Sequence, residues 1–108
     1  MIIRNILDLQ NAGNLDKELF QTLADGSATI ERIVSAGHST PEGEWYDQEK
    51  DEWVILLQGD AVLRFGNNEL INLKSGDYIF IKAHNRHRVE YTSSSPQCVW
   101  LAIHGIFS

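Results

Sequence analysis

The chain has 108 residues, of which 43% are hydrophobic and 22% are charged. This length and composition are typical of one folded domain and exclude a disordered or fibrous chain. Nine Lys and Arg residues stand against fifteen Asp and Glu residues, a formal net charge of −6, so we expect neither a nucleic acid nor a membrane as a partner. The longest aliphatic run, 54–57, is far shorter than the ~20 residues of a membrane span. Because Arg4 and Asp8 interrupt the N-terminal apolar stretch where a signal-peptide core would lie, we expect a cytoplasmic protein.

We expect a single domain of residues 1–108, in which residues 1–26 form an N-terminal strand and one short helix. Four apolar residues of this segment recur at helical spacing, namely Leu15, Leu19, Phe20 and Leu23. Asn14 is a suitable N-cap for such a helix, and Gly26 is placed to end it.

Residues 27–108 are predicted to form short strands joined by turns. Segments rich in β-branched and aromatic residues lie at 28–34, 53–58, 61–65, 69–73, 78–82, 87–92 and 98–103. Gly, Asn, Asp and Ser residues lie between most of them, as in Gly66-Asn67-Asn68. Short strands with turn signals at intervals of about 8 to 12 residues indicate an all-β barrel or sandwich.

The last predicted strand is apolar on both faces. Val99, Leu101 and Ile103 alternate along it with Cys98, Trp100 and Ala102. One face is therefore expected to line the interior, with Cys98 as a buried thiol, and the other to pack against a second sheet or subunit. This pattern predicts a homodimer.

Two segments, 52–61 and 75–89, resemble the two signature motifs of the cupin superfamily. Glu52 and Gly59 keep the spacing that ends the first motif, and Gly76 and His87 keep their separation in the second. In the second motif, residues 82, 84 and 91 depart from the usual proline, glycine and asparagine. The resemblance covers residues 38–91, about half of the chain, and implies an all-β cupin jelly-roll barrel with a pocket inside it.

The two histidines of the first cupin motif are missing from this sequence. With a spacer of three residues before Glu52 their positions fall on Tyr46 and Gln48, and with a spacer of four they fall on Trp45 and Asp47. The sequence does not choose between these two pairs.

The resemblance implies a first hypothesis, a metal-dependent cupin that acts on a small organic molecule. Typical members hold iron, manganese, nickel or zinc through three imidazoles and a carboxylate. This chain keeps Glu52 and His87, and Asp47 or Gln48 would give a third donor. One imidazole among oxygen donors is expected to hold late transition metals less tightly than three.

A second hypothesis is a metal-free cupin that binds a small molecule as a sensor or accessory module. Its pocket would use Tyr46, Gln48, Glu52 and His87 as hydrogen-bonding groups between apolar walls. A third is a metal-free isomerase or epimerase, in which His87 exchanges protons with Tyr46 or Glu52. Alternation places His87, Val89 and Tyr91 on one face, which predicts that all three point into the barrel.

Overall fold

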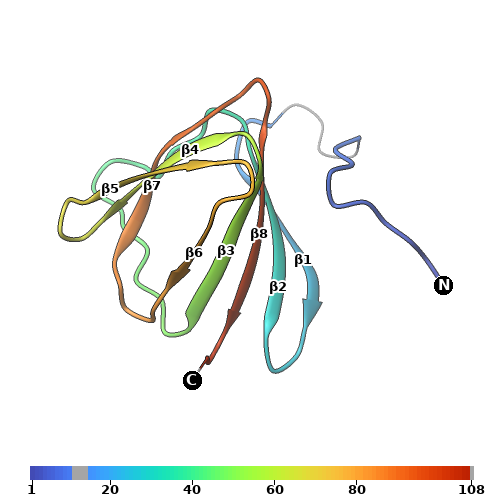
Figure 1. The fold of residues 1–108 in the computed structure, drawn as a ribbon, viewed down its shortest axis with the longest axis horizontal. Coiled ribbons are helices and arrows are strands. Elements are labelled where there is room, and N and C mark those ends of the chain that lie inside the picture. Colours follow the sequence, from blue (N-terminus) through green and yellow to red (C-terminus); the bar gives the residue numbers. More distant parts are fainter. Residues whose placement is uncertain (11–14, 108) are drawn as a thin grey trace.

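The computed structural model describes residues 1–10 and 15–107, and the regular structure of these residues is entirely β. Their eight strands are β1 (Leu19–Asp25), β2 (Thr29–Ser35), β3 (Asp51–Gln58), β4 (Asp60–Phe65), β5 (Leu70–Lys74), β6 (Tyr78–Ile81), β7 (His87–Thr92) and β8 (Cys98–Gly105). A five-stranded sheet has the order β1-β2-β8-β3-β6, and a three-stranded sheet has the order β5-β4-β7 (Figure 1). All strand pairs are antiparallel. The predicted all-β barrel is therefore confirmed.

The helix predicted in the N-terminal segment is wrong, because residues 19–25 form strand β1 at the edge of the larger sheet. Leu19 pairs with Val34 of β2, and Phe20 pairs with Ile33. Backbone pairing with β2 has overridden the helical spacing of the apolar residues. The predicted N-cap, Asn14, lies outside the described residues. In the part of the chain that the structure covers, no helix is long and apolar enough to cross a membrane.

The core lies between the two sheets and is built from the alternating inward side chains of the central strands. Val54 and Leu56 of β3 and Trp100 and Ala102 of β8 come from the larger sheet. They pack with side chains of the smaller sheet, among them Leu63 of β4. Alternation of inward and outward side chains at every second residue gives each sheet one apolar inner face.

Cys98, at the start of β8, is completely buried, which confirms the prediction of a buried thiol. Its Sγ lies 3.2 Å from the carbonyl oxygen of Asp60 and 3.4 Å from the Oγ of Ser93. The thiol therefore fills a space beneath the β3–β4 turn.

A bulge in β7 changes which of its side chains face the interior. Leu63 of β4 pairs with Val89, but the preceding residue Val62 pairs with Tyr91. Glu90 is thus an extra residue in β7, and the alternation shifts there. Tyr91 is 51% exposed, so the prediction that it points into the barrel is wrong, whereas His87 is buried and Val89 lines the interior.

Candidate functional site: a cavity between the two sheets

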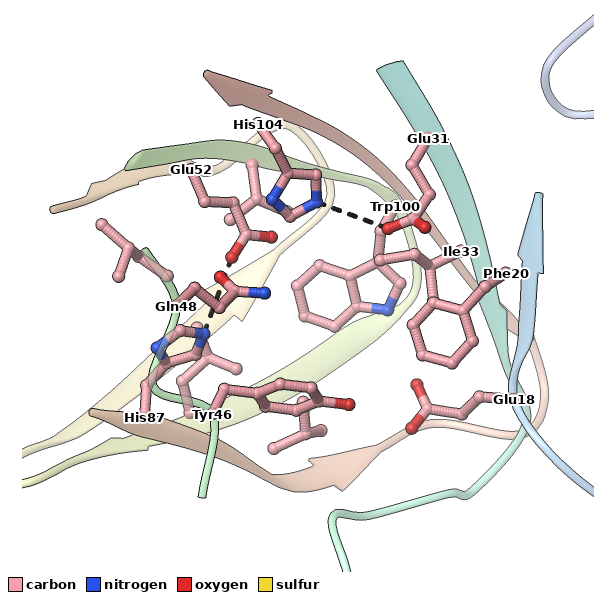
Figure 2. A pocket seen from close by; sticks show the side chains of 14 residues that line it. Glu18, Phe20, Glu31, Ile33, Tyr46, Gln48, Glu52, His87, Trp100 and His104 are labelled. Carbon is pink, nitrogen blue, oxygen red and sulfur yellow. Dashed lines mark hydrogen bonds and ion pairs between the residues drawn. The ribbon is translucent and has the colours of Figure 1, made fainter. Parts of the chain in front are cut away.

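A cavity of about 70 Å³, partly open to solvent, lies inside the barrel (Figure 2). Its apolar wall consists of Phe20, Ile33, Val54, Leu63, Ile81, Val89 and Trp100. Its polar groups belong to Glu18, Glu31, Tyr46, Gln48, Glu52, His87 and His104. Apolar walls with a few converging polar groups are typical of a small-molecule site.

Glu52 and His87 are the most deeply buried polar residues of this cavity, with exposed fractions of 7% and 6%. Glu52 lies on the inner face of β3, where it pairs with His104 of β8 and Ile81 of β6. His87 begins β7 and pairs with Phe65 of β4. The two sheets therefore bring the His87 Nε2 and Glu52 Oε1 atoms to 3.6 Å from each other.

The orientation of the His87 ring is fixed by its backbone surroundings. Its Nδ1 lies 2.9 Å from the carbonyl oxygen of Asn85, and because a carbonyl only accepts, Nδ1 carries a proton. Nε2 therefore faces the Glu52 carboxylate. Burial lowers the pKa of His87, but the Glu52 carboxylate and the Asn85 carbonyl outweigh burial and leave this pKa above its ordinary value.

Tyr46 and Gln48 both reach the cavity. The backbone N–H of Tyr46 donates to the carbonyl of His87 and the N–H of His87 donates back, so that the two rings stack with centroids 5.6 Å apart. Burial, together with the carboxylates of Glu18 and Glu52, raises the pKa of Tyr46, so its phenol remains a hydrogen-bond donor. The carbonyl of Gln48 accepts the N–H of His84 at 2.8 Å.

The alternative pair, Trp45 and Asp47, does not line the cavity. Asp47 is exposed, and its Oδ1 lies 2.8 Å from the Nδ1 of His84. Trp45 packs beneath the guanidinium of Arg86, at 4.8 Å. Of the two candidate pairs, Tyr46 and Gln48 therefore line the cavity beside Glu52, and Trp45 and Asp47 do not.

Three polar residues of the cavity, Glu18, Glu31 and His104, were not predicted from the sequence. Glu31 lies on β2 and its Oε1 is 3.4 Å from the Nε2 of His104 on β8. Glu18, just before β1, accepts a hydrogen bond of 2.7 Å from the Oγ of Ser35. His104 could have been found from the sequence, because alternation along the last strand places it on the same face as Trp100. Glu18 could not, because it lies next to a segment that was predicted to be a helix and is a strand.

This geometry does not confirm the metal-binding hypothesis. Within residues 1–10 and 15–107, no group of three or more His, Cys, Asp and Glu side chains is arranged to hold a metal ion. Glu52 and His87 converge, and Gln48 is drawn at the same end of the cavity (Figure 2). These residues supply one imidazole, one carboxylate and one amide oxygen, which is less than a typical structural or catalytic site for a late transition metal.

The chain belongs to the cupin family, because the family model for the cupin domain matches residues 31–104. A solved structure from Ralstonia eutropha, provisionally named a mannose-6-phosphate isomerase, is 34% identical with a TM-score of 0.88, and the match covers 99% of this chain and 100% of that one. A search of curated proteins finds no match.

More distant structures share the fold alone. A cupin superfamily protein from Desulfitobacterium hafniense is 23% identical with a TM-score of 0.73, over 88% of this chain and 83% of that one. The iron(II) form of HppE in complex with its substrate is 14% identical with a TM-score of 0.68, over 80% of this chain and 52% of that one.

Proposed function

We propose that this chain binds a small organic molecule in the cavity of its barrel, and that Glu52 and His87 hold the ligand by hydrogen bonds. The observation that carries this proposal is the position of these two side chains, which are more than nine-tenths buried and yet line a cavity that opens to solvent. Buried charged groups are costly unless they are paired and hydrogen-bonded. A separation of 3.6 Å leaves each of them free to bond a ligand.

The pair offers complementary chemistry to a hydroxyl or amine group of a ligand. The carboxylate of Glu52 accepts hydrogen bonds, and the Nε2 of His87 donates one when the imidazole is charged and accepts one when it is neutral. The phenol of Tyr46 is a second donor at the same cavity. The same groups are placed to move a proton to or from a ligand, as an isomerase or epimerase would require.

The proposal is tested by NMR titration of the ¹⁵N-labelled protein with short polyols, hydroxy acids and amino alcohols. We expect at least one compound to shift the indole signal of Trp100 and the backbone signals of the cavity residues. Glu52→Gln and His87→Gln should each weaken that binding about tenfold or more, because each removes a charge-assisted hydrogen bond. Asp47→Asn, a change just outside the cavity, is the matched control and should have no effect. Shifts confined to the outer surface, or equal binding by all variants, would contradict the proposal.

A divalent metal is the second candidate ligand, and the convergence of Glu52 and His87 favours it. His87 donates its Nδ1–H to a backbone carbonyl, an arrangement that also orients metal-binding histidines. With Gln48 as third donor the site would polarise a bound organic group. Elemental analysis after reconstitution with iron, manganese, nickel and zinc tests this candidate. It predicts a stoichiometric metal that Glu52→Ala and His87→Ala each abolish, and substoichiometric metal in the wild type would exclude it.

The cavity is not suited to a sugar phosphate, the substrate class in the name of the Ralstonia protein. Phosphate sites usually contain Arg, Lys or a cluster of backbone N–H groups. Among the described residues that line the cavity, none is Lys or Arg and three are Glu. A phosphate group would therefore be repelled.

We propose further that the protein is a cytoplasmic homodimer. The outer face of the larger sheet supports this proposal, because two copies of the chain could associate through the side chains of β3, β6 and β8 on that face. Trp53 pairs there with Ile103 and with Phe80, which is 43% exposed, and Tyr78 beside them is 66% exposed. Apolar and aromatic side chains gathered on one face are typical of an interface with another chain.

A further inference from the structure

We propose that the ligand of this cavity is a short amino alcohol, whose ammonium group binds at the end of the cavity bounded by Glu18 and Glu31. This inference rests on the proposed function, since it names the class of molecule that the same cavity accepts. It follows from the charge, the aromatic groups and the size of the cavity.

The polar groups of the cavity lie at two ends. Figure 2 shows Glu52, Gln48 and His87 at one end, and Glu18 and Glu31 at the other with the ring of Phe20 beside them. Glu31 comes from β2 and Glu18 from the segment just before β1. A ligand that satisfies both ends therefore needs two different polar groups, separated by an apolar spacer.

The end formed by β1 and β2 is suited to a cation. Among residues 1–10 and 15–107, the Glu18 carboxylate receives one hydrogen bond, from the Oγ of Ser35, and a carboxylate can accept about four. Glu31 is 3.4 Å from the Nε2 of His104 and likewise retains free lone pairs. Aromatic faces attract ammonium groups, and the rings of Phe20 and Trp100 line the same space. Three carboxylates and two imidazoles line the cavity, and its described lining contains no Lys or Arg.

The burial of Glu52 distinguishes this cavity from an acidic surface that is simply hydrated by solvent. Glu52 is 7% exposed and lines the cavity, and among the described residues its charged partner is His87, whose Nε2 lies 3.6 Å from its Oε1. One such contact leaves most of the acceptor capacity of the carboxylate unused. A buried carboxylate with unused lone pairs favours a ligand that brings a donor, which a hydroxyl group does.

The size of the cavity limits the ligand to a short chain. A volume of about 70 Å³ corresponds to roughly five to seven water positions, and therefore to a molecule of about six non-hydrogen atoms. Two polar groups and a spacer of four carbons meet this limit, as in 4-amino-1-butanol.

The experiment compares three probes that share one hydroxyl group and one carbon chain. They are 4-amino-1-butanol, 4-hydroxybutyrate and 1,4-butanediol, which carry a positive charge, a negative charge and no charge at the second end. Binding is followed by the indole N–H signal of Trp100 in ¹H–¹⁵N spectra of the wild-type protein. We expect the amino alcohol to bind about tenfold or more tightly than 1,4-butanediol, because a charge-assisted hydrogen bond is added, and 4-hydroxybutyrate to bind more weakly than both.

Variants locate the ammonium group. Glu18→Gln and Glu31→Gln should each reduce the affinity for 4-amino-1-butanol about tenfold and that for 1,4-butanediol by a smaller factor, because only the ammonium group is charged. Glu69→Gln, an exposed change outside the cavity, serves as control. In Glu18→Gln the amide oxygen can still accept the hydrogen bond from Ser35. If one of the two variants fails to fold, the other variant and the comparison of the three probes still test the inference.

Equal or tighter binding of 4-hydroxybutyrate would overturn this inference but leave the proposed function standing. Failure of all three probes to bind would overturn this inference, and the proposed function falls only if the broader panel also fails.

Discussion

Glu52 and His87 form the buried polar pair of the cavity. Glu and His side chains are more often exposed to solvent, but here the pairing of β3 with β6 buries the carboxylate and the position at the start of β7 buries the imidazole. Desolvation alone disfavours the charged form of each group. Their mutual attraction, with the Asn85 carbonyl on Nδ1, reverses this effect for the imidazole.

The raised pKa of His87 predicts how stability depends on pH. A histidine whose folded pKa lies above its unfolded value of ~6.5 stabilises the folded state below that value. This stabilisation is lost as the pH rises through the folded pKa. We therefore expect the stability advantage of the wild type over His87→Gln, measured by urea unfolding, to be largest below a pH of about 6.5 and to shrink as the pH rises above it. His84→Gln, an exposed histidine change, should keep the wild-type pH dependence, and a wild-type advantage that grows with pH would refute the assignment.

At the level of residues, the sequence predicted the buried acid and imidazole of the site but not the other charged groups. Glu52 and His87 stand at fixed distances from glycines that a known motif requires, so their inward position could be inferred from one sequence. Glu18 and Glu31 belong to no motif, and their place in the cavity depends on the pairing of β1 with β2. Which residues replace the motif histidines also depended on the path of the loop before β3.

At the level of strands, the polar residues of the turns predicted most of the boundaries. The predicted segments agree with β2 to β8 to within about two residues, because Gly, Asn, Asp or Ser residues interrupt the apolar alternation at the turns. Strand β1 was missed because its apolar residues happen to repeat at helical spacing. Local pattern alone cannot reveal the partner strand that keeps such a segment extended.

The turn between β3 and β4 depends on Gly59 for two physical reasons. Its φ is +98°, a region that residues with a Cβ rarely adopt. A Cβ there would also lie 2.7 Å from the Sγ of Cys98 and 2.8 Å from the Oγ of Ser93. The glycine that ends the first motif is thus explained by a close approach of the turn to β8.

Gly59→Ala should lower the free energy of unfolding by about 3 kcal/mol or more, from backbone strain and overpacking together. Gly76→Ala is the matched control, because Gly76 also has a positive φ, of +94°, but a Cβ there would meet nothing within 4 Å. It should cost only about 1 kcal/mol. Urea unfolding monitored by tryptophan fluorescence measures both values, and equal losses would show that the contact with Cys98 does not matter.

On the scale of the whole molecule, the larger sheet has two apolar faces, one toward the cavity and one toward the outside. Strand β8 lies between β2 and β3 and contributes to both faces. The inner face has a partner in the smaller sheet. The outer face of β3 and β6 presents aromatic side chains to solvent in the single chain, with Trp53 and Tyr78 rings 5.4 Å apart.

This exposed face predicts a dimer in solution, measured by sedimentation velocity. Phe80→Glu should weaken self-association about tenfold or more, because the interface would have to bury an unpaired charge. Tyr91→Glu places the same charge at an exposed aromatic position of the smaller sheet and should leave association unchanged. A wild-type monomer at high concentration, or equal effects of both variants, would rule out this interface.

Long-range ¹H–¹⁵N NMR of the histidine rings tests whether a ligand binds at the Glu52 and His87 pair itself, as claimed above. The spectrum is recorded on labelled wild-type protein without ligand and with the tightest-binding small molecule of the titration panel. We predict that Nδ1 of His87 stays protonated in both states, that the Nε2 signal moves on binding, and that Glu52→Gln abolishes this change. A bound ligand that leaves both ring nitrogens of His87 unchanged would contradict the claim.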